Sequence, residues 1–439
     1  MTKILATVGP VSEGKNLIKF LEKTDMVRLN MSHNTLSWHK KNIDKIKKKN
    51  KKKIILVDIP GVKPRTLNKS IIKIKKGQLL RFSYLNKGKE IIPLSNPLPK
   101  ITNKPSFFSL SDGAFEFKFI SLKKNILSGK SLQSFDLFSK KGLNIPNAIY
   151  NNSLQEKLYL KYLKKIKKLK IDCIGLSFIQ DSKILKKLKK KYPMFLFVSK
   201  LENSLGYINR KDIIQNSDAI MIDRGDLSAE VGIANLSNFS EKIINDCKTF
   251  GKPSIIATEN LNSLIKEKTP TKSDVINIDY YLSKKIDYIM LSDETATSNN
   301  WYNALDWINR YLGKKFKSNI IKDQLSIENL INDFNNQIII VFSKKGYFYE
   351  KVFNKNFHKL FLFTENKNMI KKLSLRTDVH ASLVKYPKKS LDNFFYQNIK
   401  NNLKNIFIKN KYAYLISLIF PRKNSRANSV SIIEKKDFI

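Results

Sequence analysis

Eight short apolar runs, rich in Ile, Val and Leu, alternate with helical patterns along the first part of the chain. The runs cover residues 4–10, 26–33, 54–60, 173–178, 195–202, 219–226, 254–261 and 288–295. Short, fully apolar strands separated by helices predict a parallel sheet covered on both faces, and eight such units are the number that closes a (β/α)8 barrel. We therefore expect an α/β protein built on a TIM barrel.

Two stretches depart from this alternation. Between the third and fourth runs, segments such as "QLLRFSYL" are broken by turn-like "NPLPK" and "LSGK", a pattern that predicts an inserted β-rich domain. A second βα alternation begins at "IIIVFS" and predicts a separate C-terminal α/β domain. The expected division is 1–66 and 142–315 for the barrel, 67–141 for the insertion and 316–439 for the C-terminal domain.

The formal net charge of +45 raises the question of a nucleic-acid partner. In residues 157–170 and 183–192, however, the lysines fill the positions between apolar residues at helical spacing, which is typical of solvated helix faces. Lysine is abundant in loops as well, so the charge reflects composition. We expect no specific nucleic-acid partner.

The cysteine and hydropathy patterns bear on the compartment. The two cysteines, Cys173 and Cys247, form neither a disulfide framework nor a metal-ligand pattern, which fits a reducing compartment. No stretch approaches the roughly 20 uncharged apolar residues of a membrane span, and no signal-peptide pattern opens the chain. We expect a cytoplasmic protein without a membrane partner.

Polar side chains stand where the apolar runs end, which is where barrel enzymes build their active sites. These strand-end residues are Arg28, Asn30, Ser32, His33, Asp58, Lys200, Glu202, Asp223, Arg224, Asp226 and Thr258. In a closed barrel they would ring a single mouth. Because independent surface residues would not all fall at the same end of the strands, the set predicts one functional site.

The chemistry of this set suits an anionic substrate. Glu202 and Asp226 could place two hard oxygen ligands on one Mg²⁺ ion, with Lys200 and Arg28 supplying positive charge beside it. Gly225 would let backbone N–H groups approach an anion closely. Taken singly, each residue also has a plain structural explanation: Lys200 and Glu202 as a surface ion pair, Asp226 as a helix cap, and the glycine as part of a turn.

Several motifs resemble those of pyruvate kinases, in the same order along the chain. "TKILATVGP", "VRLNMSH", "SKKGLNIP", "VSKLEN", "IDRGDL", "GKPSIIAT" and "IMLSDETA" are each similar to a family motif. The resemblance covers nearly the whole chain. It implies a glycolytic phosphotransferase that moves the phosphoryl group of phosphoenolpyruvate to ADP, giving pyruvate and ATP.

The resemblance also implies roles for individual residues. Lys200 would stabilise charge on the phosphoryl group and the enolate, and Glu202 and Asp226 would bind Mg²⁺, with Mn²⁺ as the alternative. Thr258 would hydrogen-bond the substrate carboxylate together with the backbone amides of Gly225 and Asp226, and would relay the proton that converts the enolate to pyruvate. The residues expected around the nucleotide and the transferred phosphates are Arg28, Asn30, Ser32, His33, Arg65 and Lys141. The inserted domain would be a mobile lid that carries Asp112 over the site.

The stretch "DIPGVKPRT", residues 58–66, departs from the family in a way that concerns K⁺. Potassium-dependent members have a glutamate where Lys63 stands, near a bound K⁺; Asn30, Ser32 and Asp58 belong to the same region. A lysine ammonium would deliver fixed positive charge about where that ion would sit and would repel a second cation. We therefore expect that K⁺ is not required.

Other departures weaken the expected substrate affinity or regulation. Asp223 and Glu259 add negative charge near an anionic substrate. In the C-terminal domain, Lys345 and Phe348 replace hydroxyl residues of the sugar-phosphate turn of regulated relatives, so we expect an impaired effector site.

Two alternatives to a pyruvate kinase stay open at this point. One is another Mg²⁺-dependent phosphoenolpyruvate or pyruvate barrel enzyme, and the other is a catalytically weakened scaffold or basic binding protein that retains the fold. By analogy with the family, the expected assembly is a homotetramer.

Overall fold

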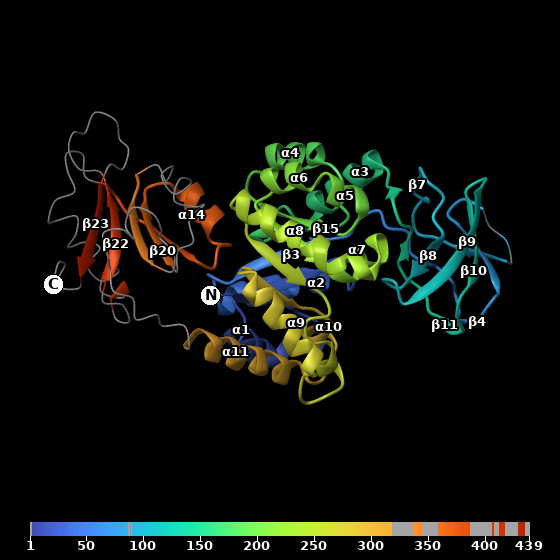
Figure 1. The fold of residues 1–439 in the computed structure, drawn as a ribbon, viewed down its shortest axis with the longest axis horizontal. Helices are drawn as coiled ribbons and strands as arrows, with labels where there is room; N and C mark the ends of the chain where they lie inside the picture. Colours follow the sequence, from blue (N-terminus) through green and yellow to red (C-terminus); the bar gives the residue numbers. More distant parts are fainter. Residues whose placement is uncertain are drawn as a thin grey trace. The chain divides into compact units, whose positions relative to one another are not determined.

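The computed structural model describes residues 2–86, 88, 90–317, 337–344, 359–386, 406–407, 412–417 and 429–434. Two compact units divide the chain, Thr2–Gly313 and Lys314–Ile439. Lys345 and Phe348 of the predicted effector turn lie outside the described residues. Figure 1 shows the described elements of each unit and labels many of them.

The first unit is built on a closed barrel of eight parallel strands, which confirms the predicted fold class. The strands, in their order around the barrel, are β1 (Lys3–Thr7), β18 (Tyr288–Leu291), β17 (Ser254–Ala257), β16 (Ala219–Asp223), β15 (Leu196–Leu201), β14 (Cys173–Leu176), β3 (Ile54–Ile59) and β2 (Met26–Asn30). The last five strands along the chain are buried along their whole length. Strands buried on both sides account for the continuous apolar runs in the sequence.

Helices follow the barrel strands along the chain. They are α1 (Leu17–Glu22), α2 (Leu36–Lys49), α3 (Asn152–Ile166), α4 (Ser182–Lys191), α5 (Ser204–Ile208), α6 (Arg210–Asn216), α7 (Arg224–Val231), α8 (Leu236–Thr249), α9 (Lys272–Ser283), α10 (Asp293–Ala296) and α11 (Trp301–Lys317). Short polar side chains start many of them: Thr35, Asn151, Asp181, Asn203 and Thr271 each accept a backbone N–H at the N-cap of α2, α3, α4, α5 and α9. The predicted lysine-rich helices are α3 and α4, whose apolar residues face inward.

The insertion between β3 and β14 is a β domain with its own core. Its strands are β4 (Ile72–Ile74), β5 (Leu79–Ser83), β6 (Ile91–Pro93), β7 (Lys100–Ile101), β8 (Phe107–Leu110), β9 (Phe115–Lys123), β10 (Ile126–Ser131), β11 (Phe135–Leu137), β12 (Leu143–Asn144) and β13 (Ala148–Ile149). Most neighbours pair antiparallel, as expected, but β5 and β6 are parallel. Phe82, Phe108 and Phe117 lie fully buried at its centre.

The second unit contains a five-stranded sheet in the order β21-β20-β19-β22-β23. Its described elements are β19 (Ile338–Phe342), β20 (Lys359–Thr364), α14 (Lys367–Leu373), β21 (Val379–Leu383), β22 (Tyr412–Ser417) and β23 (Ser429–Glu434). The first four strands are parallel and follow the predicted apolar runs, whereas β23 is antiparallel and was not predicted. Positions of all domain boundaries stay predictions.

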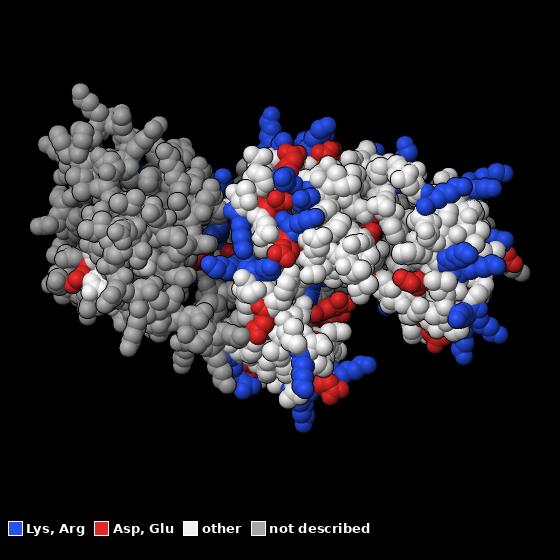
Figure 2. Space-filling model, viewed as in Figure 1, with Lys and Arg blue, Asp and Glu red and all other residues white. Residues whose placement is uncertain are grey.

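The surface carries charges of both signs. Figure 2 shows Lys and Arg side chains interspersed with Asp and Glu over the described part of one face. Several of the lysines have acidic partners, for example Lys187 with Glu156 at 3.0 Å and Lys189 with Asp218 at 2.8 Å. Among the described residues, none of the helices has the length and apolar character needed to cross a membrane.

Candidate active site

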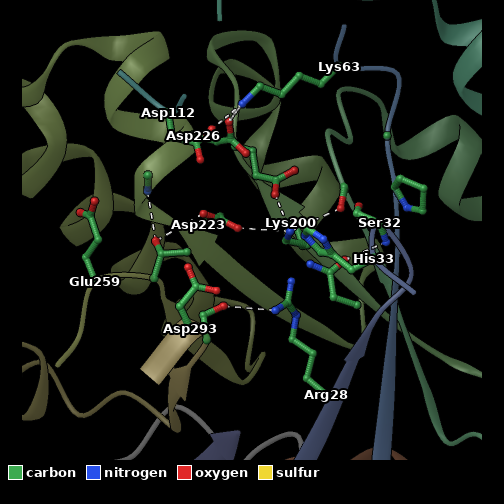
Figure 3. A pocket seen from close by; sticks show the side chains of 18 of the residues that line it. Arg28, Ser32, His33, Lys63, Asp112, Lys200, Asp223, Asp226, Glu259 and Asp293 are labelled. Carbon is green, nitrogen blue, oxygen red and sulfur yellow. Dashed lines mark hydrogen bonds and ion pairs between the residues drawn. The ribbon is translucent and has the colours of Figure 1, made fainter. Parts of the chain in front are cut away.

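The carboxyl ends of the barrel strands open into a pocket of about 320 Å³ (Figure 3). The predicted site residues that line it are Arg28, Asn30, Ser32, His33, Lys63, Arg65, Asp112, Lys200, Glu202, Asp223, Gly225, Asp226 and Thr258. Asp58 lies beneath the lining and is 1% exposed. Residues from separate strands of the barrel therefore line one pocket.

Lys200 lies among carboxylates at the base of the pocket. Its Nζ atom is 2.6 Å from Glu202 Oε1, 3.2 Å from Asp223 Oδ2 and 3.3 Å from Asp58 Oδ2. Burial alone would lower the pKa of Lys200, but the neighbouring carboxyl groups, Asp58 foremost, outweigh it and raise that pKa well above its usual value. Lys200 is thus a permanently charged ammonium held in a fixed place.

Arg28 shares Asp58 with Lys200. Its Nε and Nη2 atoms donate to Asp58 Oδ2 at 2.9 and 2.7 Å, and Nη1 donates to the hydroxyls of Thr7 and Ser292 at 3.1 and 3.2 Å. Although burial opposes ionisation, Lys200 and Arg28 keep the pKa of Asp58 below its usual value. One buried carboxylate therefore orients two cations toward the same pocket.

Glu202, Asp223 and Asp226 form a group that could hold a metal ion. Each offers one oxygen atom, and these atoms lie within 4.8 Å of one another. Burial raises the pKa of Glu202 well above its usual value and raises that of Asp226 to about 6. A buried, oxygen-only set of carboxylates suits a hard divalent cation, which would relieve the cost of burying these charges.

Lys63 bridges the inserted domain and the barrel. It is 4% exposed, and its ammonium pairs with Asp112 Oδ1 at 2.7 Å and with Asp226 Oδ1. Lys63 lowers the pKa of Asp112 to about 2. The predicted lid residue and a predicted metal ligand thus share one lysine (Figure 3).

Thr258 and Gly225 meet at the junction of β17 and α7. The Gly225 amide donates to Thr258 Oγ1 at 3.1 Å, and the same hydroxyl lies 3.4 Å from Asp223 Oδ1. The two groups predicted to hold one substrate carboxylate are therefore adjacent. Thr258 and Glu259 both have positive φ, 61° and 51°, which is strained backbone for residues with a side chain.

Arg224 supports this turn and does not line the pocket. Its guanidinium donates to the carbonyls of Ala257 at 3.2 Å and of Thr258, and to Asn260 Oδ1 at 3.0 Å. It also lies over the ring of Tyr281, 5.1 Å from the centroid. Arg224 therefore supports the fold of this turn, whereas its neighbours Gly225 and Asp226 line the pocket.

Some residues of the site differ from the prediction. Lys141 is not among the lining residues; its backbone exchanges hydrogen bonds with Thr66 at 2.9 and 3.1 Å. Ser177, which was missed, lies 3.3 Å from Lys200 Nζ and donates to Asp58 at 3.2 Å. Ser177 and Ser292 directly follow β14 and β18, so the strand-end rule could have found both.

Comparison with known proteins agrees with this architecture. The family described as "Pyruvate kinase, barrel domain" matches residues 1–305. A pyruvate kinase of Thermococcus litoralis is 31% identical over 310 residues, which cover 67% of this chain and 65% of that protein. One from Methanocaldococcus jannaschii is 29% identical over 314 residues, 70% of this chain and 68% of that protein.

A solved structure is also similar in fold. The crystal structure of a pyruvate kinase from Cryptosporidium parvum has a TM-score of 0.79 and covers 99% of this chain and 96% of that one, at 22% identity. This likeness concerns the fold, whereas the match to the family covers well over half of the sequence. The chain belongs to the pyruvate kinase family.

Proposed function

We propose that the protein is an active pyruvate kinase, which transfers the phosphoryl group of phosphoenolpyruvate to ADP and releases pyruvate and ATP. The observation that carries the proposal is the pairing of two buried cations, Lys200 and Arg28, on Asp58 beside an acidic cluster. Enzymes of phosphoryl transfer act mainly by aligning the reactants and stabilising negative charge. Family membership decides against another phosphoenolpyruvate barrel enzyme.

The acidic cluster supports a divalent cofactor. Glu202 and Asp226 would hold Mg²⁺, with Mn²⁺ as the alternative, because carboxylate oxygens are the ligands these cations prefer. When bound, the metal supplies positive charge that neutralises substrate oxygens. K⁺ would not be required, because the Lys63 ammonium already provides a fixed charge beside Asp226.

The chain's own residues would carry the reaction as follows. The bond from phosphorus to the enol oxygen breaks while a β-phosphate oxygen of ADP bonds to phosphorus, with the Lys200 ammonium on the oxygens that gain charge. The enolate left behind takes a proton at its methylene carbon, with Thr258 as the relay. Thr258 and the Gly225 amide would hold the substrate carboxylate.

The remaining pocket residues would serve the nucleotide and the closure of the lid. Arg28, Arg65, Asn30 and His33 would contact phosphate groups, and Lys141 would reach the nucleotide when the lid closes. Closure would exclude water, which competes with ADP for the phosphoryl group. We also propose, by analogy with the family, a cytoplasmic homotetramer.

The test is ADP-dependent formation of pyruvate, followed by coupling to lactate dehydrogenase. Wild type should turn over with Mg²⁺ as the divalent cation, and Lys200→Met, which removes the ammonium and keeps most of the side-chain volume, should not. Wild-type activity no higher than that of Lys200→Met would show that the chain is a scaffold that has kept the fold.

A further inference from the structure

Three buried polar side chains from different parts of the chain meet behind Asp226. Asn144 belongs to β12, Tyr150 follows β13, and Glu230 lies in α7; they are 0%, 3% and 2% exposed. The Tyr150 hydroxyl donates to Glu230 Oε1 at 3.1 Å, and Asn144 Nδ2 donates to Asp226 Oδ1 at 3.1 Å. No residue of this trio lines the pocket.

Two oxygen atoms of the trio lack a hydrogen-bond partner among the described residues, Glu230 Oε2 and Asn144 Oδ1. The bond to Asp226 fixes the orientation of the Asn144 amide, because a carboxylate accepts only from the NH₂ group. The side chains of Asn144 and Glu230 interact: Asn144 lowers the pKa of Glu230, an effect that is smaller than the burial that raises it. With Glu230 ionised, the two oxygens are both acceptors and neither can satisfy the other.

If Glu230 Oε2 carries a proton, the carboxylic acid can donate one hydrogen bond to Asn144 Oδ1. This bond gives both oxygen atoms a partner. Leaving either oxygen buried without a hydrogen-bond partner is unfavourable, and this favours the neutral acid. Burial acts in the same direction and raises the pKa of Glu230 to about 8.

The trio is also linked, through Phe178, to Glu202, the second predicted metal ligand. The ring of Tyr150 packs edge-to-face on Phe178, with centroids 5.2 Å apart, and the Phe178 amide donates to Glu202 Oε2 at 2.5 Å. Phe178 has a φ of 60°, a conformation that needs support from its surroundings. Tyr150 thus lies behind the groups that hold both carboxylates.

We propose that Glu230 is a positioning residue, which donates a hydrogen bond through its own proton to Asn144 and so fixes the carboxylate of Asp226 for the metal. The proposal rests on the metal site of the proposed function. Groups that hold metal ligands in place commonly change metal affinity 10–100-fold when they are replaced. Since Asn144 in β12 pairs with Ser109 in β8, the same chain of bonds ties Asp226 to the inserted domain.

The first experiment measures Mn²⁺ affinity of the substrate-free full-length protein by electron paramagnetic resonance. Glu230→Gln keeps a neutral side chain that can donate to Asn144, so its affinity should stay within about threefold of wild type. Glu230→Met keeps similar bulk without a donor and should weaken binding about tenfold or more. Glu241→Met is the matched control, because Glu241 accepts from Tyr280 at 3.1 Å on the outside of the barrel.

Two results would overturn the inference: equal affinity of Glu230→Met and wild type, or a Glu230→Gln loss as large as that of Glu230→Met. If Glu230→Met does not fold, Tyr150→Phe replaces it and should weaken Mn²⁺ binding about threefold; no change would count against the proposal. The infrared difference spectrum of wild type minus Glu230→Gln at neutral pH should contain the carbonyl band of a protonated carboxylic acid, a readout that does not involve the metal; absence of this band would contradict the proposal.

Parallel assays of pyruvate formation separate the two proposals. If wild type forms pyruvate and the Glu230 variants bind Mn²⁺ as tightly as wild type, only the positioning role is contradicted. If Glu230→Met weakens Mn²⁺ binding but wild type forms no pyruvate, only the proposed activity is contradicted. A wild type that binds no Mn²⁺ overturns the inference outright.

Discussion

The ammonium group of Lys63 forms an ion pair with the carboxylate of Asp226. Lys63 follows β3, and Asp226 lies in the first turn of α7, so the pair links two sides of the pocket. The Lys63 ammonium therefore already supplies a fixed positive charge on this side of the pocket, the contribution that a monovalent cation would otherwise make.

The first prediction is that turnover does not depend on K⁺. In tetramethylammonium buffer at constant ionic strength, added KCl should change the rate less than about twofold. A tenfold rise, equivalent to about 1.4 kcal/mol of transition-state stabilisation, would contradict the prediction. Lys63→Glu should lower potassium-free activity and make part of it recoverable by K⁺, whereas Lys69→Glu, an exposed change in the inserted domain, should do neither.

The second prediction concerns Asp223, which stands 3.2 Å from Lys200 and next to Thr258. Its negative charge competes with an anionic substrate for the Lys200 ammonium. Asp223→Asn keeps the shape and removes the charge, so the KM for phosphoenolpyruvate should fall about threefold to tenfold, a change of roughly 0.7–1.4 kcal/mol. Glu259→Gln, which lines the pocket without an ion pair among the described residues, is the control and should change KM less.

The third prediction concerns the strained turn at Thr258. Arg224→Leu leaves several buried carbonyl and amide oxygens without their donor, so the free energy of unfolding should fall by about 2–4 kcal/mol. Arg210→Leu removes a partly exposed pair with Asp246 and should cost about 1 kcal/mol or less. Denaturant unfolding measures both; equal losses would show that Arg224 is not the main support of the turn.

The fourth prediction is a pH dependence of stability due to Glu230. Burial raises its pKa from 4.5 to about 8, so between these values the folded protein holds a proton that the unfolded chain has lost. The stabilisation is complete at low pH and is lost as the pH rises through the folded pKa.

Wild type should therefore lose stability relative to Glu230→Gln as the pH rises from about 5 to about 8, by up to about 1.4 kcal/mol per pH unit. Chemical unfolding of both proteins at several pH values measures the difference. A difference that is independent of pH would mean that Glu230 carries no extra proton in the folded state.

The barrel and most of the pocket could be predicted from the sequence because both follow local rules. Apolar runs mark strands, and the side chain at the end of each strand faces the mouth, so Arg28, Lys200 and Thr258 could be found without a structure. The Tyr150–Glu230–Asn144 trio follows no such rule. Its members stand in unrelated segments, and each is an ordinary polar residue until packing removes water from around it.

The place of Lys63 illustrates the same limit. Its position within "DIPGVKPRT" showed that a positive charge had entered the site, but the sequence does not show which carboxylate it would contact. That choice depends on where β3, α7 and the inserted domain meet. Arg224 is the opposite case, since its neighbours in "DRGD" line the pocket while its own side chain turns into the protein.

The bridge between Arg65 and Gly142 brings together the two points where the chain leaves the barrel and returns to it. It has a consequence for folding kinetics. Ile55, in β3, bonds to Asp172, 117 residues later, and closing so long a loop is entropically slow. An insertion that collapses first on its own phenylalanine core and clamps its ends at this bridge would shorten the loop left to close. Early folding of the β domain would then speed the closure of the barrel into which it is inserted.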